Sequence, residues 1–158
     1  MQIDGLSGTG KSSLAVELTR RGYCAVDSAA EFAHFGDPVT GRPTDVQIRD
    51  NWIWDLLKLR TFVRESSASP VFICGGALNQ EHCADLFTHR FMLRIDDATM
   101  RHRLLNRRTN DFGKTPEELA EQLELNRRAG VAGQGERWVI VDATRTIAEV
   151  ADNITQDL

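Results

Sequence analysis

Short apolar runs alternate along this chain with longer segments in which apolar residues recur every three or four positions. Glycine, proline or aspartate bounds the short runs, as is typical of buried strands, whereas the longer segments have the spacing of amphipathic helices. Strands are predicted at residues 1–4, 23–26, 71–74, 91–95 and 138–141. Strands that alternate with helices form a parallel sheet covered on both faces. We therefore expect an α/β fold, a three-layer αβα sandwich around a five-stranded parallel sheet.

The helical segments vary in the clarity of their pattern. Residues 45–65 predict one long amphipathic helix, because apolar side chains recur there every three or four positions: Ile48, Trp52, Leu56, Leu59 and Val63. Other helices are expected after residue 13, from Asp96 through Arg108, from Thr115 onward, and over residues 147–154. Residues 34–44, 109–114 and 129–136 predict loops.

The most specific motif lies at the start of the chain. Gly5, Gly10, Lys11 and Ser12 spell G-x-x-x-x-G-K-S between an expected strand and an expected helix, which is the context of a phosphate-binding P-loop. Glycines there let backbone N–H groups converge on phosphate oxygens, and the helix adds its positive end. Lys11 should reach the β and γ phosphates and Ser12 should bind Mg²⁺. The expected nucleotide contacts are Gly5, Leu6, Ser7, Gly8, Thr9, Gly10, Lys11, Ser12 and Ser13, with ATP and Mg²⁺ as cofactors.

The rest of the chain narrows the class of P-loop protein. The strings N-K-x-D and D-x-x-G of GTPases do not occur. An AAA or ABC ATPase should carry an apolar strand that ends in Asp-Glu, but residues 71–74 end in Gly75-Gly76. Asp96 and Asp97 follow residues 91–95 and could mimic that pair or begin a helix. Small-molecule kinases are the class that remains.

In the order of its elements, the chain resembles the nucleoside monophosphate kinase and shikimate kinase group of P-loop phosphotransferases. The segment Arg103-Leu104-Leu105-Asn106-Arg107-Arg108 is similar to the R-x-x-x-R segment of that group. The resemblance implies that Arg103 lies against the adenine and Arg107 on the transferred phosphates, from one helix face. Ordinary ion pairing of both arginines is the alternative. Residues 109–114 take the position of a short lid that closes over the phosphates, or they form a simple polar turn.

The resemblance also implies an acceptor side to the site. Asp27 ends the second expected strand, at the sheet edge where ligands bind, and would hold the acceptor hydroxyl or a water on Mg²⁺; a helix cap is the alternative. The segment Asp142-Ala143-Thr144-Arg145 resembles the loop that lines the nucleotide base in this group, which implies a base contact for Thr144; a simple turn that leads into the next helix is the alternative. Shikimate itself is disfavoured as the acceptor, because D-x-D and G-G-G are replaced by Asp27-Ser28-Ala29 and Gly75-Gly76-Ala77.

The acceptor itself is expected to bind to residues 34–66. Candidate contacts lie off the apolar stripe of the helix predicted at residues 45–65, whereas Trp52 lies in register with Ile48 and Leu56 and should belong to the core. Those candidates are Arg49, Asp50, Trp54 and Arg60.

Composition excludes several other classes. A length of 158 residues fits one domain, 1–158. The net charge of −4 argues against a nucleic-acid binder, and the longest apolar run is too short to span a membrane. Three cysteines without metal-ligand spacing indicate reduced thiols. We expect a cytoplasmic monomer or homodimer, whose first strand is either very short or begins upstream of Met1.

These features together predict an ATP- and Mg²⁺-dependent kinase that transfers a phosphoryl group to a small-molecule acceptor. The alternative is a nucleotide-binding regulatory module, or a slow ATPase, without such an acceptor.

Overall fold

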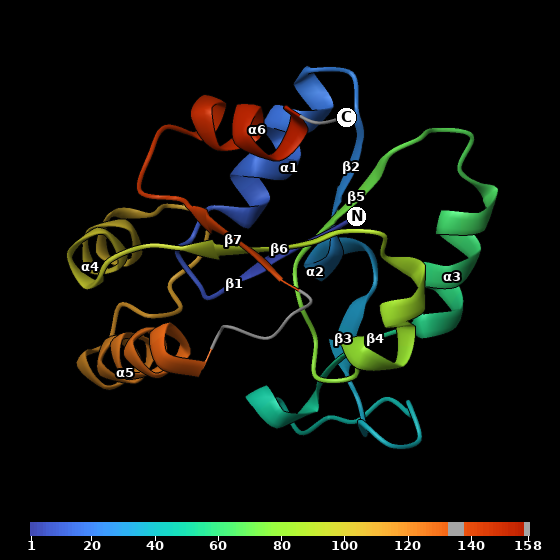
Figure 1. Ribbon diagram of the computed structural model, residues 1–158. Coiled ribbons are helices and arrows are strands. Elements are labelled where there is room, and N and C mark those ends of the chain that lie inside the picture. The colour runs from blue at the N-terminus through green and yellow to red at the C-terminus, as the bar shows by residue number, and fades with distance from the viewer. Residues whose placement is uncertain (133–137, 157–158) are drawn as a thin grey trace.

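The computed structural model describes residues 1–132 and 138–156 and has a five-stranded sheet at its centre (Figure 1). In sheet order the strands are β2 (Cys24–Asp27), β5 (Val71–Cys74), β1 (Gln2–Gly5), β6 (Arg90–Arg94) and β7 (Val139–Asp142). Every neighbouring pair is parallel. The predicted α/β fold with five parallel strands is confirmed, and each predicted strand agrees with the observed one to within a residue.

Helices cover the two faces of the sheet, and a small two-stranded sheet lies beside it. α1 (Lys11–Arg20) and α6 (Ile147–Thr155) pack together on one face, and α5 (Pro116–Ala132) lies on the other (Figure 1). α4 (Asp97–Asn106) packs against α5. The remaining elements lie beside β5 and β2: α2 (Ser28–Glu31), β3 (Ala33–Phe35), β4 (Trp52–Trp54), α3 (Leu56–Glu65) and the 3-10 helices η1 (Arg49–Asn51) and η2 (Gln80–Leu86).

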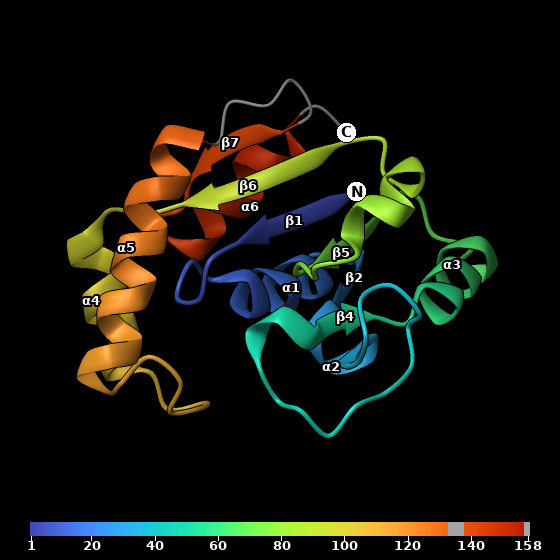
Figure 2. The same ribbon diagram turned by 90° about the horizontal axis from the view of Figure 1, so that it is seen from below.

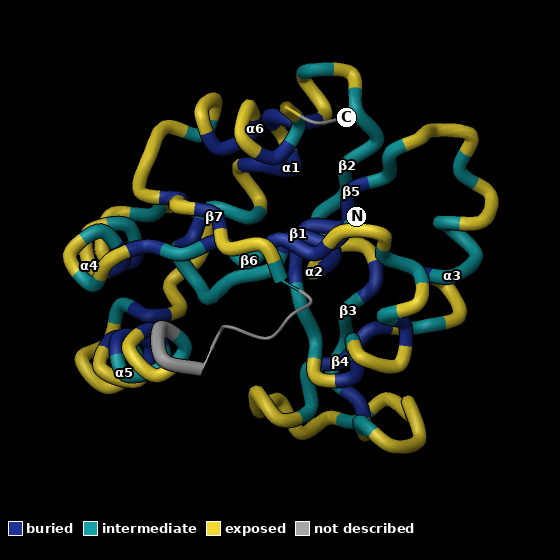
Figure 3. The backbone as a smooth tube through the Cα atoms, in the orientation of Figure 1, coloured by how far each residue is buried: buried dark blue, intermediate teal, exposed yellow. Residues whose placement is uncertain are grey.

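The main core lies between the sheet and α1. Ile3 of β1 and Leu93 of β6 are buried there with Leu14 and Leu18 of α1, in the interior that Figure 3 draws in dark blue. Successive side chains of a strand point to opposite faces. Gln2 and Asp4 therefore lie on the face of β1 that is turned away from α1.

The helix predicted over residues 45–65 is wrong in its first half. Residues Trp52–Trp54 form β4, which pairs antiparallel with β3, and α3 begins only at Leu56. The Asp55 side chain caps α3 by accepting from the Lys58 N–H at 2.9 Å. Aromatic and β-branched side chains favour strands, and Trp-Ile-Trp finds a strand partner that the helical spacing did not reveal.

Because these residues form a strand and not a helix, the burial predicted for the two tryptophans was also wrong. Trp54, predicted to contact the acceptor, is 1% exposed and lies in a second core cluster with Phe32 and Leu59. Trp52, predicted to belong to the core, is half-buried. Alternation along β4 sends the two rings to one face and the Ile53 side chain to the other.

Smaller differences concern the predicted loops and helix ends. β3 occupies part of the loop predicted at residues 34–44, and α4 ends at Asn106 rather than Arg108. α5 extends to Ala132 into the loop predicted at residues 129–136, of which 133–136 lie outside the described residues.

Candidate nucleotide and phosphate site

The G-x-x-x-x-G-K-S motif forms the turn between β1 and α1. Gly8 and Gly10 have φ angles of 86° and 102°, in the left-handed region that other residues rarely adopt. Gly10 is the N-cap of α1, and among the described residues no side chain caps it and no acidic residue lies in the first turn. The backbone N–H groups and the positive end of α1 are thus available to an anion.

Lys11 begins α1, and its ammonium group turns back toward the loop. Nζ donates to the Gly5 carbonyl at 2.5 Å and to the Leu6 carbonyl at 3.0 Å. Burial lowers the pKa of Lys11, and the carboxylates of Asp4 and Asp27 oppose this shift. Both carboxylates are therefore close enough to act on the lysine charge.

Ser12 and Ser13 are exposed in the first turn of α1. The described residues contain no group of three histidine, cysteine or acidic side chains that could hold a metal ion. Mg²⁺ does not require one, because it keeps several waters and binds one or two protein oxygens together with substrate phosphates. The Ser12 hydroxyl and the Asp27 carboxylate are oxygen donors of this kind, and their role in metal binding stays a prediction.

Arg103 reaches the P-loop from α4. Its guanidinium donates to the carbonyls of Gly8 at 3.5 Å, Thr9 at 3.3 Å and Ala143 at 2.9 Å. One side chain thus joins the P-loop to the segment that follows β7. The alternative of an ion pair does not hold for Arg103 among the described residues, since its acceptors are all neutral carbonyl oxygens.

Arg107 also contacts the P-loop, though not from the helix face predicted for it. α4 ends at Asn106, and Arg107 is its C-cap with extended backbone angles. Its guanidinium donates to Ser7 Oγ at 3.0 Å and to the Phe112 carbonyl. Burial lowers the pKa of Arg107, which indicates that the guanidinium is partly withdrawn from water.

Thr144 follows β7 and is exposed. Its N–H and hydroxyl both donate to Asp142 Oδ1, at 3.0 Å and 2.6 Å. Because Arg103 binds carbonyls of both the P-loop and Ala143, the segment that follows β7 and contains Thr144, here called the Thr144 loop, borders the P-loop. Contact with a base stays a prediction.

Asp27 ends β2 and is the N-cap of α2, where its carboxylate accepts from the Ala29 N–H at 3.0 Å. The capping alternative is therefore what the structure shows. Its second oxygen can still act on a ligand, since a cap uses one oxygen. The Asp27 charge raises the pKa of Lys11, so Asp27 lies close to the P-loop lysine.

Asp4 is a residue of the site that the sequence analysis missed. Its carboxylate accepts from the Gly5 N–H at 2.7 Å and from Gln80 Nε2 at 3.4 Å, and it acts on the Lys11 charge. The signal was present, because an inner strand of a parallel sheet is normally apolar throughout, whereas Gln2-Ile3-Asp4 alternates.

The segment predicted as a lid, residues 109–114, connects α4 to α5. Lys114 Nζ pairs with Asp111 at 2.6 Å, and Phe112 is 45% exposed. Arg107 ties this segment to the P-loop through the Phe112 carbonyl. Closure over a ligand stays a prediction.

Two of the four acceptor contacts predicted in residues 34–66 are engaged elsewhere. Trp54 is core, as described above, and Arg60 donates to both oxygens of Asp85 at 2.8 Å. Arg49 and Asp50 are exposed on η1, and their contact with an acceptor stays a prediction. Two half-buried rings from this region, Phe35 and Trp52, pack edge to face with centroids 5.0 Å apart.

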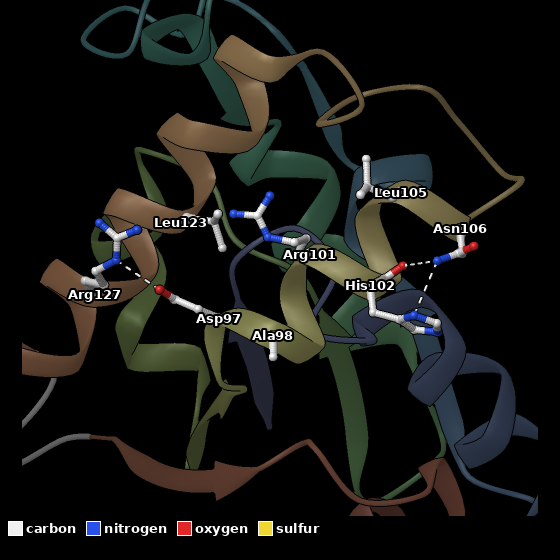
Figure 4. Close-up of a pocket in the computed structure, with 8 residues that line it drawn as sticks. All are labelled: Asp97, Ala98, Arg101, His102, Leu105, Asn106, Leu123 and Arg127. Carbon is white, nitrogen blue, oxygen red and sulfur yellow. Dashed lines mark hydrogen bonds and ion pairs between the residues drawn. The ribbon is translucent and has the colours of Figure 1, made fainter.

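A groove of about 550 Å³ lies elsewhere, between α4 and α5 (Figure 4). Asp97 binds Arg127 Nε at 2.9 Å at one end, and Asn106 donates to the His102 carbonyl at the other. The residues that line this groove include none of the P-loop. It is therefore separate from the candidate site.

Among the described residues, no helix combines the length and the apolar character needed to cross a bilayer.

Comparison with solved structures identifies kinases of similar fold. The chain is 17% identical to a gluconokinase from Sinorhizobium meliloti 1021, with 99% of this chain and 93% of that one covered and a TM-score of 0.54. It is also 17% identical to a deoxyadenosine kinase from M. mycoides with bound dATP, with 99% and 97% covered and a TM-score of 0.55. The predicted resemblance to P-loop small-molecule kinases is confirmed at the level of the fold.

No curated protein sequence matches the chain. A family model described as an AAA domain matches residues 2–124. The match holds although β5 is followed by Gly75 and Gly76 rather than by Asp-Glu. Since the model spans most of the sequence, the chain belongs to the AAA domain family.

Proposed function

We propose that this protein is an ATP- and Mg²⁺-dependent kinase that transfers the γ-phosphoryl group of ATP to a small metabolite. One observation carries the proposal. Lys11, Arg103 and Arg107 surround the P-loop, and among the described residues each donates its hydrogen bonds to neutral oxygens rather than to a carboxylate. Because none of the three cations is held by a hydrogen bond to a carboxylate in the described part of the chain, all three can turn to the oxygens of a polyphosphate without breaking such a bond.

The cations have different roles in this proposal. Lys11 exchanges its contacts to the Gly5 and Leu6 carbonyls for the β and γ phosphates. Arg103 lies between the P-loop and the Thr144 loop and supports the nucleoside end. Arg107 stabilises the charge that develops on the transferred group, because phosphoryl transfer depends on positioning and charge stabilisation. Mg²⁺, held by Ser12 and Asp27 with the phosphates, would neutralise further charge on them.

Asp4 completes the site by orienting the acceptor. An acceptor oxygen forms a bond to the γ phosphorus while the bond from that phosphorus to the bridging oxygen breaks, and ADP leaves. The proton of the acceptor hydroxyl passes to the Asp4 carboxylate. Residues 34–66 would bind the acceptor, where Phe35 and Trp52 offer an aromatic surface, and residues 109–114 would act as a short lid that excludes water.

The experiment is to measure ADP formation from Mg·ATP alone and with single acceptors. Gluconate and deoxyadenosine belong in the panel because the structural neighbours are a gluconokinase and a deoxyadenosine kinase. ADP formation that requires one acceptor, with the phosphoryl group recovered on it, supports the proposal. Equal ADP formation without any acceptor supports an ATPase instead, and nucleotide binding without turnover supports a regulatory module.

The two carboxylates can be separated by Mg²⁺ titration. Asp27→Asn should raise the Mg²⁺ concentration needed for half-maximal rate. Asp4→Asn should lower kcat at saturating Mg²⁺, by about 10² or more for loss of a positioned base. The reverse pattern would exchange the two roles.

A further inference from the structure

A chain of polar side chains crosses the face of the sheet opposite α1 and ends at Asp4. Gln2 is fully buried, and Arg90 is 5% exposed. Arg90 Nε donates to Gln2 Oε1 at 2.8 Å, Gln2 Nε2 donates to Gln80 Oε1 at 2.7 Å, and Gln80 Nε2 donates to Asp4 Oδ2 at 3.4 Å. We call these four residues the polar relay. Figure 2 shows its elements from below, with the N-terminal end of β1 beside β6 and the segment that follows β5.

The direction of each hydrogen bond in the relay follows from the chemistry of its ends. Arginine can only donate, so the oxygen of Gln2 must face Arg90. The nitrogen of Gln2 therefore faces the oxygen of Gln80, and the nitrogen of Gln80 faces a carboxyl oxygen of Asp4. Each amide thus donates toward the carboxylate, and bonds aligned in this way polarise one another.

The cationic end of the relay is itself held in place. Arg90 donates to the two oxygens of Glu81 at 2.6 Å and 3.1 Å, and its guanidinium carbon lies 4.0 Å from the centre of the Trp138 ring. Glu81 follows Gln80 in η2, so one short segment holds both the middle and the end of the relay. The position of Gln80 is therefore fixed by its own bond to Gln2 and by the ion pair of the neighbouring Glu81 with Arg90.

We propose that Gln80, oriented by Gln2 and Arg90, is a positioning residue that fixes the Asp4 carboxylate for phosphoryl transfer. This inference rests on the proposed function, in which Asp4 orients the acceptor. Lys11 of α1 also lies close enough to Asp4 to interact with its charge, and it leaves to bind phosphate in that proposal. Gln80 and the Gly5 N–H then remain to hold the carboxylate.

A purely structural role for Gln80 makes a different prediction. Gln2 and Arg90 are buried and need their partners, but Asp4 and Gln80 are only half-buried. Gln80→Leu also removes the acceptor of the buried Gln2 Nε2, so it should lower Tm. Water can replace the bond between Gln80 and the half-buried Asp4 carboxylate, so loss of that bond should add little to the fall in Tm. Loss of orientation should appear in kcat instead.

The test is a double-mutant cycle of Gln80→Leu and Asp4→Asn, with ADP formation as the readout at saturating Mg·ATP and acceptor. Gln80→Leu should lower kcat about tenfold, as for loss of a hydrogen bond to a charged group, with the KM for ATP unchanged. In the Asp4→Asn background the same substitution should cause no further loss. Leu86→Ala, in the same segment but packed against the second core cluster, serves as control and should lower Tm while leaving kcat unchanged.

Three outcomes would contradict the proposed role of Gln80. Unchanged kcat in Gln80→Leu overturns the relay, and so does an equal loss in the wild-type and Asp4→Asn backgrounds, because Gln80 would then act elsewhere. Absence of phosphoryl transfer by the wild-type protein overturns the proposed function, and the relay assignment with it. Thermal unfolding of each variant shows whether a loss of kcat reflects loss of the fold.

Discussion

Replacement of Gly76 by alanine tests the role of Asp4 by a steric route. A Cβ atom added to Gly76 would lie 2.3 Å from Asp4 Oδ2, 2.5 Å from Oδ1 and 2.6 Å from Cγ. The backbone of Gly76 is not left-handed, so alanine causes no backbone strain there. The carboxylate must move to relieve the contact.

The size of this movement follows from the contact distances. Real Cβ contacts do not fall below 3.0 Å, so the nearest oxygen must shift by at least 0.7 Å, the difference between 3.0 Å and 2.3 Å. A misplacement of about 1 Å at a reacting group can reduce the rate about 10²-fold. Overpacking against a half-buried carboxylate should cost about 1 kcal/mol, which lowers Tm by roughly 2–4 °C for a chain of this size.

The assay compares kcat for ADP formation and Tm in Gly76→Ala and in a control of similar expected stability. Gly22→Ala suits this purpose, because Gly22 has φ 91° with no atom within 4 Å of an added Cβ and lies just beyond the end of α1. Its backbone strain should cost about 1–2 kcal/mol and leave kcat unchanged. If Gly76→Ala keeps the wild-type kcat while its Tm falls, Asp4 does not orient the acceptor.

Three further predictions concern charged residues. Lys11→Ala should abolish phosphoryl transfer while thermal unfolding stays cooperative, and unchanged turnover would contradict the proposed function. Arg107→Ala should lower kcat more than it weakens ATP binding measured by titration; the opposite pattern would assign Arg107 to ground-state binding. Hydrogen bonds from Arg20 and Arg21 lower the pKa of Glu17 to about 2. Its stabilisation is therefore present above the unfolded pKa of about 4.3 and lost as pH falls toward 2, so Glu17→Gln should show a smaller fall in Tm across that range.

The parallel sheet could be predicted because its strands are marked by local signals. Val71–Cys74 is apolar throughout and is bounded by Pro70 and Gly75, as expected for a strand buried on both faces. The P-loop could be predicted for the same reason, since the residues of its motif lie within eight positions of one another in the sequence. These features need no knowledge of distant partners.

Residues 45–65 could not be predicted in the same way, because pairing between distant segments determines β4. Trp54 pairs with Ala33, and the Asn79 side chain binds both its N–H and its carbonyl at 2.9 Å. These contacts join three segments of the chain. Helical spacing of apolar residues in the sequence carries no information about them, and it favoured the wrong structure.

The residues three and four positions from an arginine help to predict whether it forms an ion pair within its own helix or reaches a distant site. Arg20 and Arg21 have Glu17 three and four positions earlier, and both pair with it at 2.8 Å. Arg103 has no acidic residue three or four positions away in either direction, so its helix offers it no ion pair. It extends instead to carbonyl oxygens of the P-loop, about 95 residues earlier in the sequence. An arginine without an acidic neighbour at helical spacing, after a strand of a P-loop domain, is thus a better candidate for phosphate binding than arginine content alone.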